Sequence, residues 1–317
     1  MAPEQNKSVA WLAYLAVFIG TIGHASSEFV AVYSGIKGPE VSVWRFMIGG
    51  FGLLVACMLI PSARDLLTPL REDWKRIVPL ALAGMTMAQF IFHWSLDFAN
   101  IVQVATIVTT MPILVVLMNR VIYHVPVTAP KVVSGIGAML GIMFLLTDGY
   151  LARLSGSSES FTGVLMALGC ALLGASYTVL IRPVIVKWGA MRITALVFIL
   201  GAFLLWPLVA IFFGVKVNPL TLFDRDMQAW ASILTLGFWN TTVAMVIFFW
   251  GLSVAPDQAR ANYIFFLKPV IAAFLGLYIL RQPITTPQLL AIVVITGCVL
   301  VEVFYDQIFR RRAPKSN

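Results

Sequence analysis

The sequence predicts an all-α integral membrane protein of ten transmembrane helices, arranged as two five-helix repeats of inverted topology around a central cavity. Three observations predict this class. First, 60% of the 317 residues are hydrophobic and 11% are charged, with a mean hydropathy of +0.91, which is far outside the range of soluble domains. Second, about ten apolar stretches are each long enough to cross roughly 30 Å of hydrocarbon as a helix. Third, a proline-containing segment occurs twice.

The repeated segment has three prolines separated by 14 and then 4 residues. The first copy holds Pro112, Pro126 and Pro130, and the second holds Pro269, Pro283 and Pro287. The offset of 157 residues is about half of the chain, so we expect an internal duplication.

The apolar stretches are expected to be helices, because unpaired backbone groups are costly in lipid and the alternating pattern of a β-barrel is absent. The expected ranges are 9–33, 40–60, 76–96, 101–119, 131–148, 161–183, 192–214, 228–252, 259–281 and 287–308. The Ser/Gly-rich run 155–160 separates a first repeat (1–154) from a second (161–309), and a basic cytoplasmic tail (310–317) follows. Since each repeat holds an odd number of helices, the second repeat enters the membrane upside down.

The basic residues predict a multi-pass protein of a bacterial inner (plasma) membrane, with both termini cytoplasmic. An even number of helices places both termini on one side. The loops expected outside contain Lys37, Arg153, Lys216, Arg225 and Arg281. The loops and tail expected inside hold a larger number of lysines and arginines, as the positive-inside rule requires.

Several function classes do not fit the distribution of charges and motifs. The net charge of +8 is dispersed over loops, without the interleaved aromatic residues of a nucleic-acid interface. No GxxxxGK[ST] sequence for nucleotide phosphates and no HExxH sequence occurs. The three cysteines lie in different expected helices without metal-ligand spacing. We therefore expect no cofactor, no metal and no nucleic acid, and we expect membrane lipid and a small-molecule substrate as partners.

These features resemble the EamA-domain branch of the drug/metabolite transporter superfamily. The resemblance rests on the two five-helix halves, on the pair Arg45-Phe46 in the second helix, and on a proline-led apolar helix followed by a turn and a glycine-containing helix. The family pattern often has Gly-Glu after that proline, where this chain has His124-Val125 and Arg281-Gln282. The resemblance implies a basket of helices around a central cavity, with helices 5 and 10 outermost. It also implies transport of small polar metabolites or drugs without ATP hydrolysis.

Ionisable residues inside the expected helices are the first candidates for function, because each costs several kcal/mol in lipid. His24 and Glu28 are four residues apart and so share a helix face. Counting about 1.5 Å per residue places them at a similar depth to Arg45 and His93, in the outer half of the membrane. We expect one polar cluster, with Glu28 as cation binder or proton carrier and a histidine that titrates near neutral pH. Structural alternatives are an Arg45 that pairs with Glu28 or loop carbonyls, and a hydrogen-bonded His93.

Lys268 lies near the middle of the ninth expected helix, directly before Pro269. Two interpretations remain open: Lys268 binds an anionic group of the substrate, or it forms a buried Lys–Glu pair that holds the halves together. Arg260, on the inner end of the same helix, is expected to be a snorkelling or gating charge, and Arg45 a structural or gating charge.

Neutral residues complete the predicted substrate site. Asn240 is the strongest, because an amide at the bilayer centre must find a partner. Trp94 and Tyr263 are further candidates, with packing as the alternative role for each aromatic ring. Gly137 and Gly141 form a GxxxG face that serves either dimerisation or packing within the bundle, so a monomer and a homodimer both stay open.

The sequence thus favours a secondary transporter, not an enzyme, that moves a small polar metabolite by alternating access. If Glu28 and Lys268 face one cavity, a zwitterion such as an amino acid fits, and the family resemblance favours export. The alternative is an anionic metabolite bound by Lys268, with Glu28 carrying a coupling proton. A membrane enzyme or a passive channel is the alternative from a different class.

Overall fold

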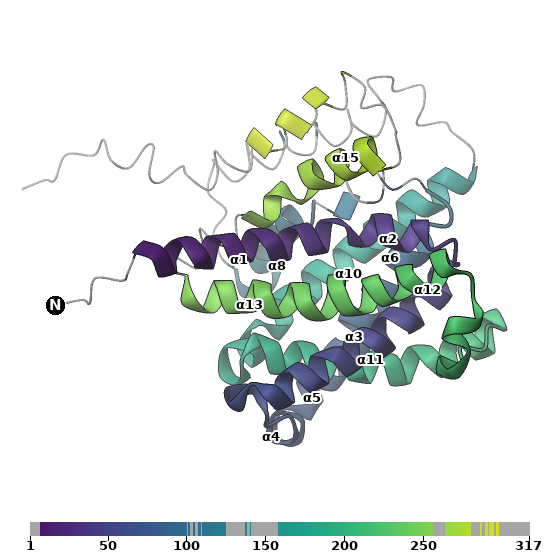
Figure 1. Cartoon of the computed structure of the whole chain (residues 1–317). Coiled ribbons are helices and arrows are strands. Elements are labelled where there is room, and N and C mark those ends of the chain that lie inside the picture. Colours follow the sequence, from purple (N-terminus) through teal and green to yellow (C-terminus); the bar gives the residue numbers. More distant parts are fainter. Residues whose placement is uncertain are drawn as a thin grey trace, which may run out of the picture.

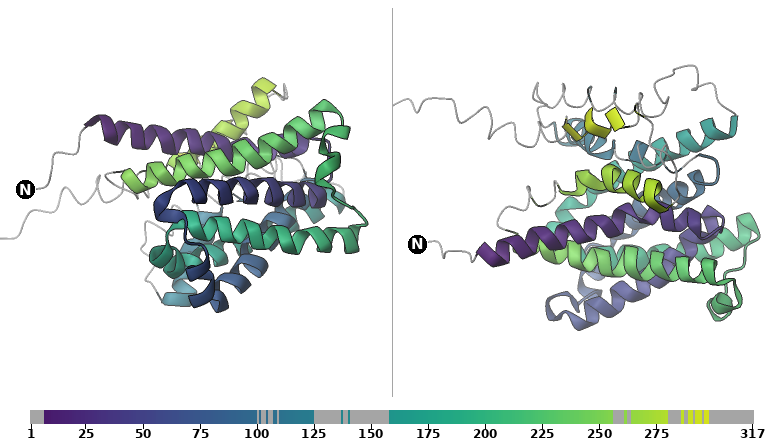
Figure 2. Two further views of the ribbon diagram at one scale, coloured as in Figure 1. Left: turned by 60° about the horizontal axis from the view of Figure 1, so that its bottom comes forward. Right: turned by 45° about the horizontal axis from the view of Figure 1, so that its top comes forward.

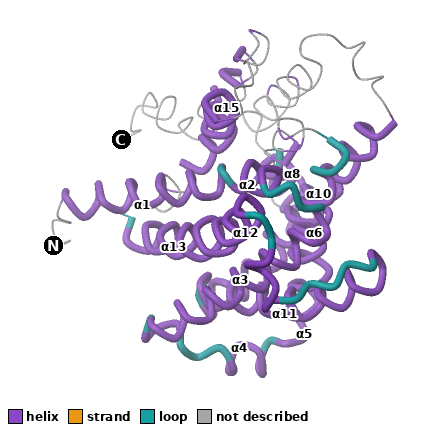
Figure 3. Tube along the Cα trace, turned by 45° about the vertical axis from the view of Figure 1, so that its right-hand side comes forward, coloured by secondary structure: helices purple, strands orange, loops and turns teal. Residues whose placement is uncertain are grey.

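The computed structural model describes residues 7–99, 110–124, 158–255 and 264–279, together with isolated positions at 101, 104, 107, 108, 137, 140, 261, 286, 289, 290, 292–294, 296 and 297. Within these ranges the regular structure is helical throughout, without strands (Figures 1 and 3). Six of the helical segments are long and apolar enough to cross a membrane. The chain is therefore a multi-pass membrane protein.

The first of the two predicted repeats contributes three of these spans. They are Trp11–Tyr33, Gly38–Leu59 and Trp74–Ser95. The first comprises α1 (Lys7–Ala25) and α2 (Ser27–Tyr33), the second is α3 (Gly38–Leu59), and the third comprises α5 (Trp74–Pro79), the π-helix η2 (Leu80–Thr86) and α6 (Met87–Ser95). Short helices η1 (Pro61–Ala63) and α4 (Leu67–Glu72) connect α3 to α5, and α8 (Met111–Tyr123) follows.

The other three spans come from the second predicted repeat. They are Phe161–Trp188 within α10 (Ser158–Trp188), Ala190–Phe213, which is α11, and Met227–Val254. The last comprises α12 (Met227–Leu234), the π-helix η5 (Thr235–Val243) and α13 (Ala244–Val254). The 3-10 helix η4 (Pro219–Asp224) connects α11 to α12, and η6 (Ile264–Leu267) leads into α15 (Lys268–Ile279).

Most expected helix ranges agree with the described elements to within a few residues. The fourth expected helix, 101–119, differs, because Thr110 is a turn residue and α8 begins only at Met111. Within the ninth expected helix, 259–281, the described residues change from the 3-10 helix η6, which ends at Leu267, to the α-helix α15, which begins at Lys268. α10 begins at Ser158, inside the run expected to be a linker. The expected helices 131–148 and 287–308 lie almost entirely outside the described residues.

The third span of each predicted repeat contains a π-helix. η2 starts at Leu80 and η5 at Thr235, which is close to the spacing between the repeated prolines. Such wide turns are rare and occur frequently at functional sites. In η5 the hydroxyl groups of Thr241 and Thr242 donate to the carbonyls five residues earlier, Leu236 O at 2.9 Å and Gly237 O at 3.1 Å. Asn240, Thr241 and Thr242 are consecutive and are all buried.

Three close helix pairs bring the two predicted repeats together: α1 with α13, α3 with α11, and α6 with α10. Figures 1 and 2 show α1 and α13 side by side along their lengths, with α15 on the other side of α1. Glycine permits the close approach of α1 to α13, because a Cβ atom on Gly23 would lie 2.4 Å from the Ala244 Cβ. Between α3 and α11, the Phe46 and Phe198 rings stack with centroids 4.5 Å apart.

Candidate functional site

Glu28 and Lys268 form a buried ion pair that joins α2 to the start of α15. The distance from Lys268 Nζ to Glu28 Oε1 is 2.5 Å, and the two side chains are 15% and 0% exposed. The Ser27 hydroxyl lies 3.1 Å from Glu28 Oε2 and 2.8 Å from the His24 carbonyl oxygen. The pair lies next to the turn at Ser26, between α1 and α2, and at the junction where the 3-10 helix η6 continues as α15. Irregular backbone within a membrane protein is tolerated where it is buried or lines a cavity.

Arg45 on α3 is the centre of a second group of polar side chains, contributed by three spans. Its Nε atom donates to Thr241 Oγ1 at 3.1 Å and its Nη1 atom donates to Gln89 Oε1 at 3.0 Å. The same Nη1 atom lies 3.1 Å from His93 Nε2. Arg45 is only 4% exposed. Among the described residues no carboxylate forms a salt bridge with it, so its guanidinium is held by neutral groups.

The hydrogen bonds around His93 assign it as a neutral imidazole. Ser42 Oγ donates to the Gly38 carbonyl at 3.0 Å and lies 2.9 Å from His93 Nδ1. Since the single Ser42 proton is used on Gly38, His93 Nδ1 carries a proton and donates it to Ser42. His93 Nε2 is then unprotonated and accepts from Arg45. Arg45 is thus fixed by a chain of hydrogen bonds that starts at the first residue of α3.

Asn240 and Thr241, adjacent on η5, connect the Arg45 group to the first span. The Asn240 amide donates to the Gly23 carbonyl at 2.5 Å and to Ser26 Oγ at 2.7 Å. Asn240 therefore holds the backbone at the interruption between α1 and α2, next to His24 and Glu28. Its Oδ1 atom is buried and accepts no hydrogen bond from the described residues.

The charges of the two groups act on one another. Lys268 and Arg45 both interact electrostatically with His24, and Glu28 interacts with Arg45. With a neutral His93, the described cluster contains the cations Arg45 and Lys268 and one carboxylate, Glu28. A buried charge needs a partner, because transfer from water is costly. One cationic charge of this cluster therefore lacks an acidic counterpart within the described residues.

A pocket of about 190 Å³ borders His93. It is formed by the α2–α3 connection and by the residues that follow α6, and its lining includes Gly35, Lys37, His93 and Asp97. His93 is the buried wall of this pocket, whereas Lys37 and Asp97 are exposed. The pocket thus ends one hydrogen bond away from Arg45.

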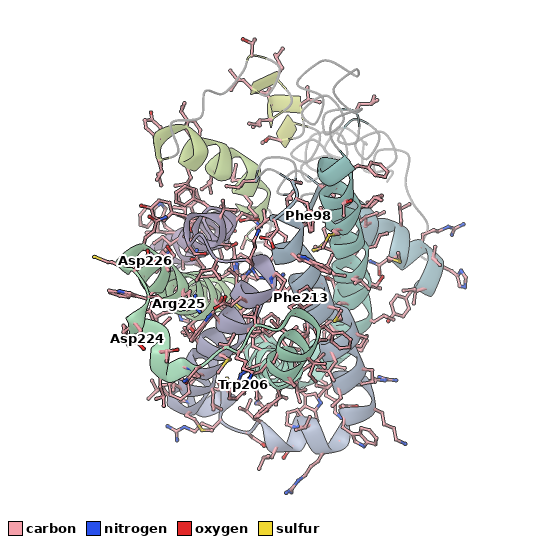
Figure 4. All side chains as sticks on the ribbon, turned by 90° about the vertical axis from the view of Figure 1, so that its right-hand side faces the viewer. Phe98, Trp206, Phe213, Asp224, Arg225 and Asp226 are labelled. Atoms are coloured by element: carbon pink, nitrogen blue, oxygen red, sulfur yellow. The ribbon has the colours of Figure 1, made fainter. Side chains whose placement is uncertain are left out.

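The structure brings most of the predicted site residues together. His24, Glu28, Arg45, His93, Asn240 and Lys268 form the cluster. The alternative in which Arg45 pairs with Glu28 does not occur, because the Glu28 carboxylate pairs with Lys268, as in the buried Lys–Glu pair left open for Lys268. Trp94 lies outside the cluster: its ring contacts Phe90, Phe98 and, at a centroid distance of 4.9 Å, Phe213. Figure 4 labels Phe98 and Phe213, two of these aromatic neighbours. Tyr263 and Arg260 lie outside the described residues.

Sequence reasoning missed Ser42 and Ser27, which support the charges of the cluster. Ser42 was detectable, since it precedes Arg45 by three positions and so shares its helix face. Ser27, directly before Glu28, had no periodic signal. The contact of Thr241 with Arg45 joins residues 196 positions apart and depends on the wide turn of η5, for which the apolar pattern gives no indication.

Comparison with known proteins places this chain in a family. The model of the EamA-like transporter family matches residues 6–147 and 161–303. An uncharacterized transporter of Archaeoglobus fulgidus is 25% identical over 261 residues, which are 81% of this chain and 86% of the relative. The uncharacterized transporter YyaM of Bacillus subtilis is 22% identical over 285 residues, covering 89% of each chain.

The fold is also similar to that of a protein of known crystal structure. The TM-score is 0.66 at 17% sequence identity, and the match covers 97% of this chain and 99% of the other. At this identity the likeness concerns the fold alone. The family model, however, matches most of the sequence, including the spans that carry Glu28, Arg45, His93, Asn240 and Lys268. This chain belongs to the EamA-like transporter family, a member of the drug/metabolite transporter superfamily.

Proposed function

We propose that this protein is a secondary transporter that binds a small carboxylate-bearing metabolite, with amino acids as the first candidates, and moves it across the plasma membrane by alternating access. One observation carries the proposal: the buried Arg45 forms no salt bridge with a carboxylate of the described residues, and it lies near the Glu28–Lys268 ion pair. A substrate carboxylate supplies the missing anion, because guanidinium binds carboxylate with two parallel hydrogen bonds.

Glu28 and Lys268 give the site a means of recognising an amino group as well. In the described conformation each charge is satisfied by the other. A zwitterion can replace this internal pair, with its ammonium on Glu28 and its carboxylate between Lys268 and Arg45. Ligand binding then separates α2 from α15, which belong to different predicted repeats. A substrate that binds the separated state better than the paired state shifts the equilibrium between these two states.

The charge balance distinguishes between amino acids. A neutral amino acid leaves the excess positive charge of Arg45 and Lys268 over Glu28 unchanged, whereas an acidic amino acid balances it. L-Glutamate therefore fits better than L-glutamine, which has the same size. Glutarate has both carboxylates but no ammonium for Glu28. If an anion without an amino group is the substrate, Glu28 serves as the carrier of a coupling proton.

The internal similarity supports the alternating-access part of the proposal. The paired prolines recur at an offset of 157 residues, and a π-helix occurs in the third span of each predicted repeat. Repeats of this kind let one half rock against the other around a site near the midplane. The charge distribution supports cytoplasmic termini, and family likeness favours export.

Binding of L-glutamate, L-glutamine and glutarate to the purified protein in detergent tests the proposal, with thermal stability as the readout, since a ligand of the folded state raises apparent stability. We expect stabilisation in the order glutamate, glutarate, glutamine. Arg45→Gln should abolish all responses, and Glu28→Gln should remove the advantage of glutamate over glutarate.

Lys75→Met is the control, because Lys75 is an exposed cation outside the cluster. Its ligand responses should equal those of the unmodified protein. Ligand responses that persist in folded Arg45→Gln and Glu28→Gln proteins would remove these residues from the site.

A further inference from the structure

We propose that the pocket bordered by Gly35, Lys37, Gly38, His93, Leu96 and Asp97, here called the vestibule, is an access site at which a substrate carboxylate is held by Lys37 before it reaches Arg45. The inference rests on the proposed function. The vestibule has a volume of about 190 Å³. Pockets for drug-sized ligands span roughly 300–1,000 Å³, so this one admits only a small metabolite.

The vestibule leads directly to the cluster. Lys37 is exposed at its mouth and His93 is 1% exposed at its base. His93 Nε2 accepts from Arg45 Nη1 at 3.1 Å, so a carboxylate that displaces this imidazole meets the guanidinium. The path from solvent to Arg45 thus passes one neutral side chain.

Lys37 is the charge of the vestibule that a ligand can use. The Asp97 carboxylate is already engaged, since both of its oxygens accept from the Gly38 N–H at 3.0 Å. This bond fixes the α2–α3 connection to the end of the third span. Partial burial raises the pKa of Asp97 above its usual value, while the Gly38 hydrogen bond and the nearby Lys37 charge oppose this shift. The described residues give Lys37 no salt-bridge partner.

Glutamate uptake into proteoliposomes tests the role of Lys37. Lys37→Gln should raise the KM for glutamate about threefold to tenfold at low ionic strength with little change in maximal rate, and added salt should reduce this effect because an exposed charge is screened. Lys216→Gln is the matched control, since Lys216 is exposed on the connection after α11, outside the vestibule. An unchanged KM in Lys37→Gln, or an equal rise in Lys216→Gln, would overturn the inference.

Thiol labelling tests the vestibule independently of transport. Leu96→Cys, placed in a chain whose three native cysteines are changed to alanine, should react faster with an anionic than with a cationic methanethiosulfonate reagent. Lys37→Gln should remove this preference. If Leu96→Cys does not react, or if the preference survives Lys37→Gln, the vestibule is not an anion-access site, even where glutamate transport itself is observed.

A second inference comes from two ion-pair clusters at opposite ends of α3. At one end, Lys187 Nζ lies 2.8 Å from Asp73 Oδ2 and 3.1 Å from Glu72 Oε2, and the Trp188 indole donates to Asp73 at 2.7 Å. At the other end, Arg225 pairs with Glu40, and the Trp44 indole donates to Glu40 at 3.1 Å. Figure 4 labels Arg225 on the connection to α12.

The two clusters have the same construction with the charges exchanged. In each, the connection before the third span of one predicted repeat binds the region around the start of the second span of the other repeat. In each, the cation also lies over the tryptophan ring, at 4.5 Å for Lys187 on Trp188 and 5.9 Å for Arg225 on Trp44. We infer that they are two latches, of which one opens while the other stays closed during the transport cycle.

Accessibility of cysteine reporters at the two ends tests the latches. Lys187→Met should raise the labelling rate of Leu70→Cys, a partly buried residue near the Asp73 latch, and leave Leu96→Cys unchanged or slower. Arg225→Gln should do the opposite. Lys75→Gln and Lys216→Gln are exposed controls that should change neither rate. Equal changes at both ends, or no change at either, would exclude a reciprocal pair of latches.

Discussion

At the scale of the residue, the Glu28–Lys268 pair has an energetic consequence that is separate from transport. Neither charge can reach bulk water easily, because Glu28 is fully buried and the Lys268 side chain is 15% exposed. Removing one member leaves the other without the partner that lies 2.5 Å away, whereas removing both leaves neither charge of the pair.

We therefore predict that Glu28→Gln and Lys268→Met each lower the free energy of unfolding by about 3–5 kcal/mol. The double variant should recover most of that loss. Thermal unfolding of the three variants in detergent measures this. Additive losses in the double variant would show that the two side chains stabilise the protein independently.

A lysine at position 45 separates the contribution of the Arg45 charge from that of the guanidinium geometry. Its guanidinium uses Nε on Thr241 and Nη1 on Gln89 and His93, a fork that an ammonium group cannot reproduce. Hydrogen bonds to a charged group contribute about 1.5–3 kcal/mol each. Arg45→Lys should thus weaken glutamate binding by about 10-fold or more while keeping the charge. Titration calorimetry checks this, and an unchanged affinity would mean that charge alone is recognised.

At the scale of the element, the close contact of α1 with α13 sets the position of the site. Gly23 supplies the carbonyl that accepts from Asn240, and its missing side chain admits Ala244. Gly23→Val should separate the two helices and cost about 1–3 kcal/mol by overpacking. Ligand affinity should also fall. Asn240 contacts Gly23, and the adjacent Thr241 contacts Arg45, so a displaced Asn240 disturbs the Arg45 group. Gly169→Val is the control, since a Cβ atom there meets nothing within 4 Å, and it should preserve both properties.

The connection between α4 and α5 predicts a pH dependence. Hydrogen bonds from Lys187 and Trp188 hold the pKa of Asp73 below its ordinary value. A depressed pKa stabilises the folded state above the unfolded pKa of about 3.9 and loses this contribution as the pH falls through the folded pKa. Asp73→Asn should therefore be less stable than the unmodified protein at neutral pH. The difference should shrink as the pH falls below about 3.9 and vanish below the lowered folded pKa. A difference that persists in acid would contradict the ion-pair explanation.

The spans of these elements could be predicted from the sequence, because about 20 consecutive apolar residues have few alternatives to a transmembrane helix. The joining of His24, Glu28, Arg45 and His93 also followed, since buried ionisable residues at one depth must compensate one another. The π-helices and the 3-10 segment before Lys268 could not be predicted. They accompany tertiary contacts, such as the hydrogen bond from Asn240 to Gly23 and the Lys268–Glu28 ion pair, that local hydropathy does not encode.

At the scale of the whole molecule, the two ends of the bundle differ in the side of the membrane that they face. The positive-inside rule predicts that the Ser62 end faces the cytoplasm and that the Asn218 end faces the outside. Cysteine introduced at Asn218 should react with an impermeant thiol reagent added to intact cells, and cysteine at Ser62 should react only after permeabilisation. The reverse pattern would invert the topology and with it the direction in which the vestibule opens.

Helices of the two predicted repeats pack against one another in pairs, and polar side chains connect these pairs. α1 packs on α13, α3 on α11 and α6 on α10, and the Glu28–Lys268 pair adds α15 to α2. A substrate that breaks one internal ion pair can therefore change the relation of the repeats. Conduction through a channel, by contrast, does not require that ligand binding changes the relation of the repeats.

A counterflow experiment distinguishes alternating access from passive flux. Purified protein in liposomes loaded with unlabelled L-glutamate is diluted into a trace of labelled L-glutamate, without ATP or an ion gradient. We expect the label to accumulate transiently above its equilibrium level, and we expect Arg45→Gln to abolish this accumulation. A label flux that is linear in concentration, with no transient accumulation, would contradict transport by alternating access.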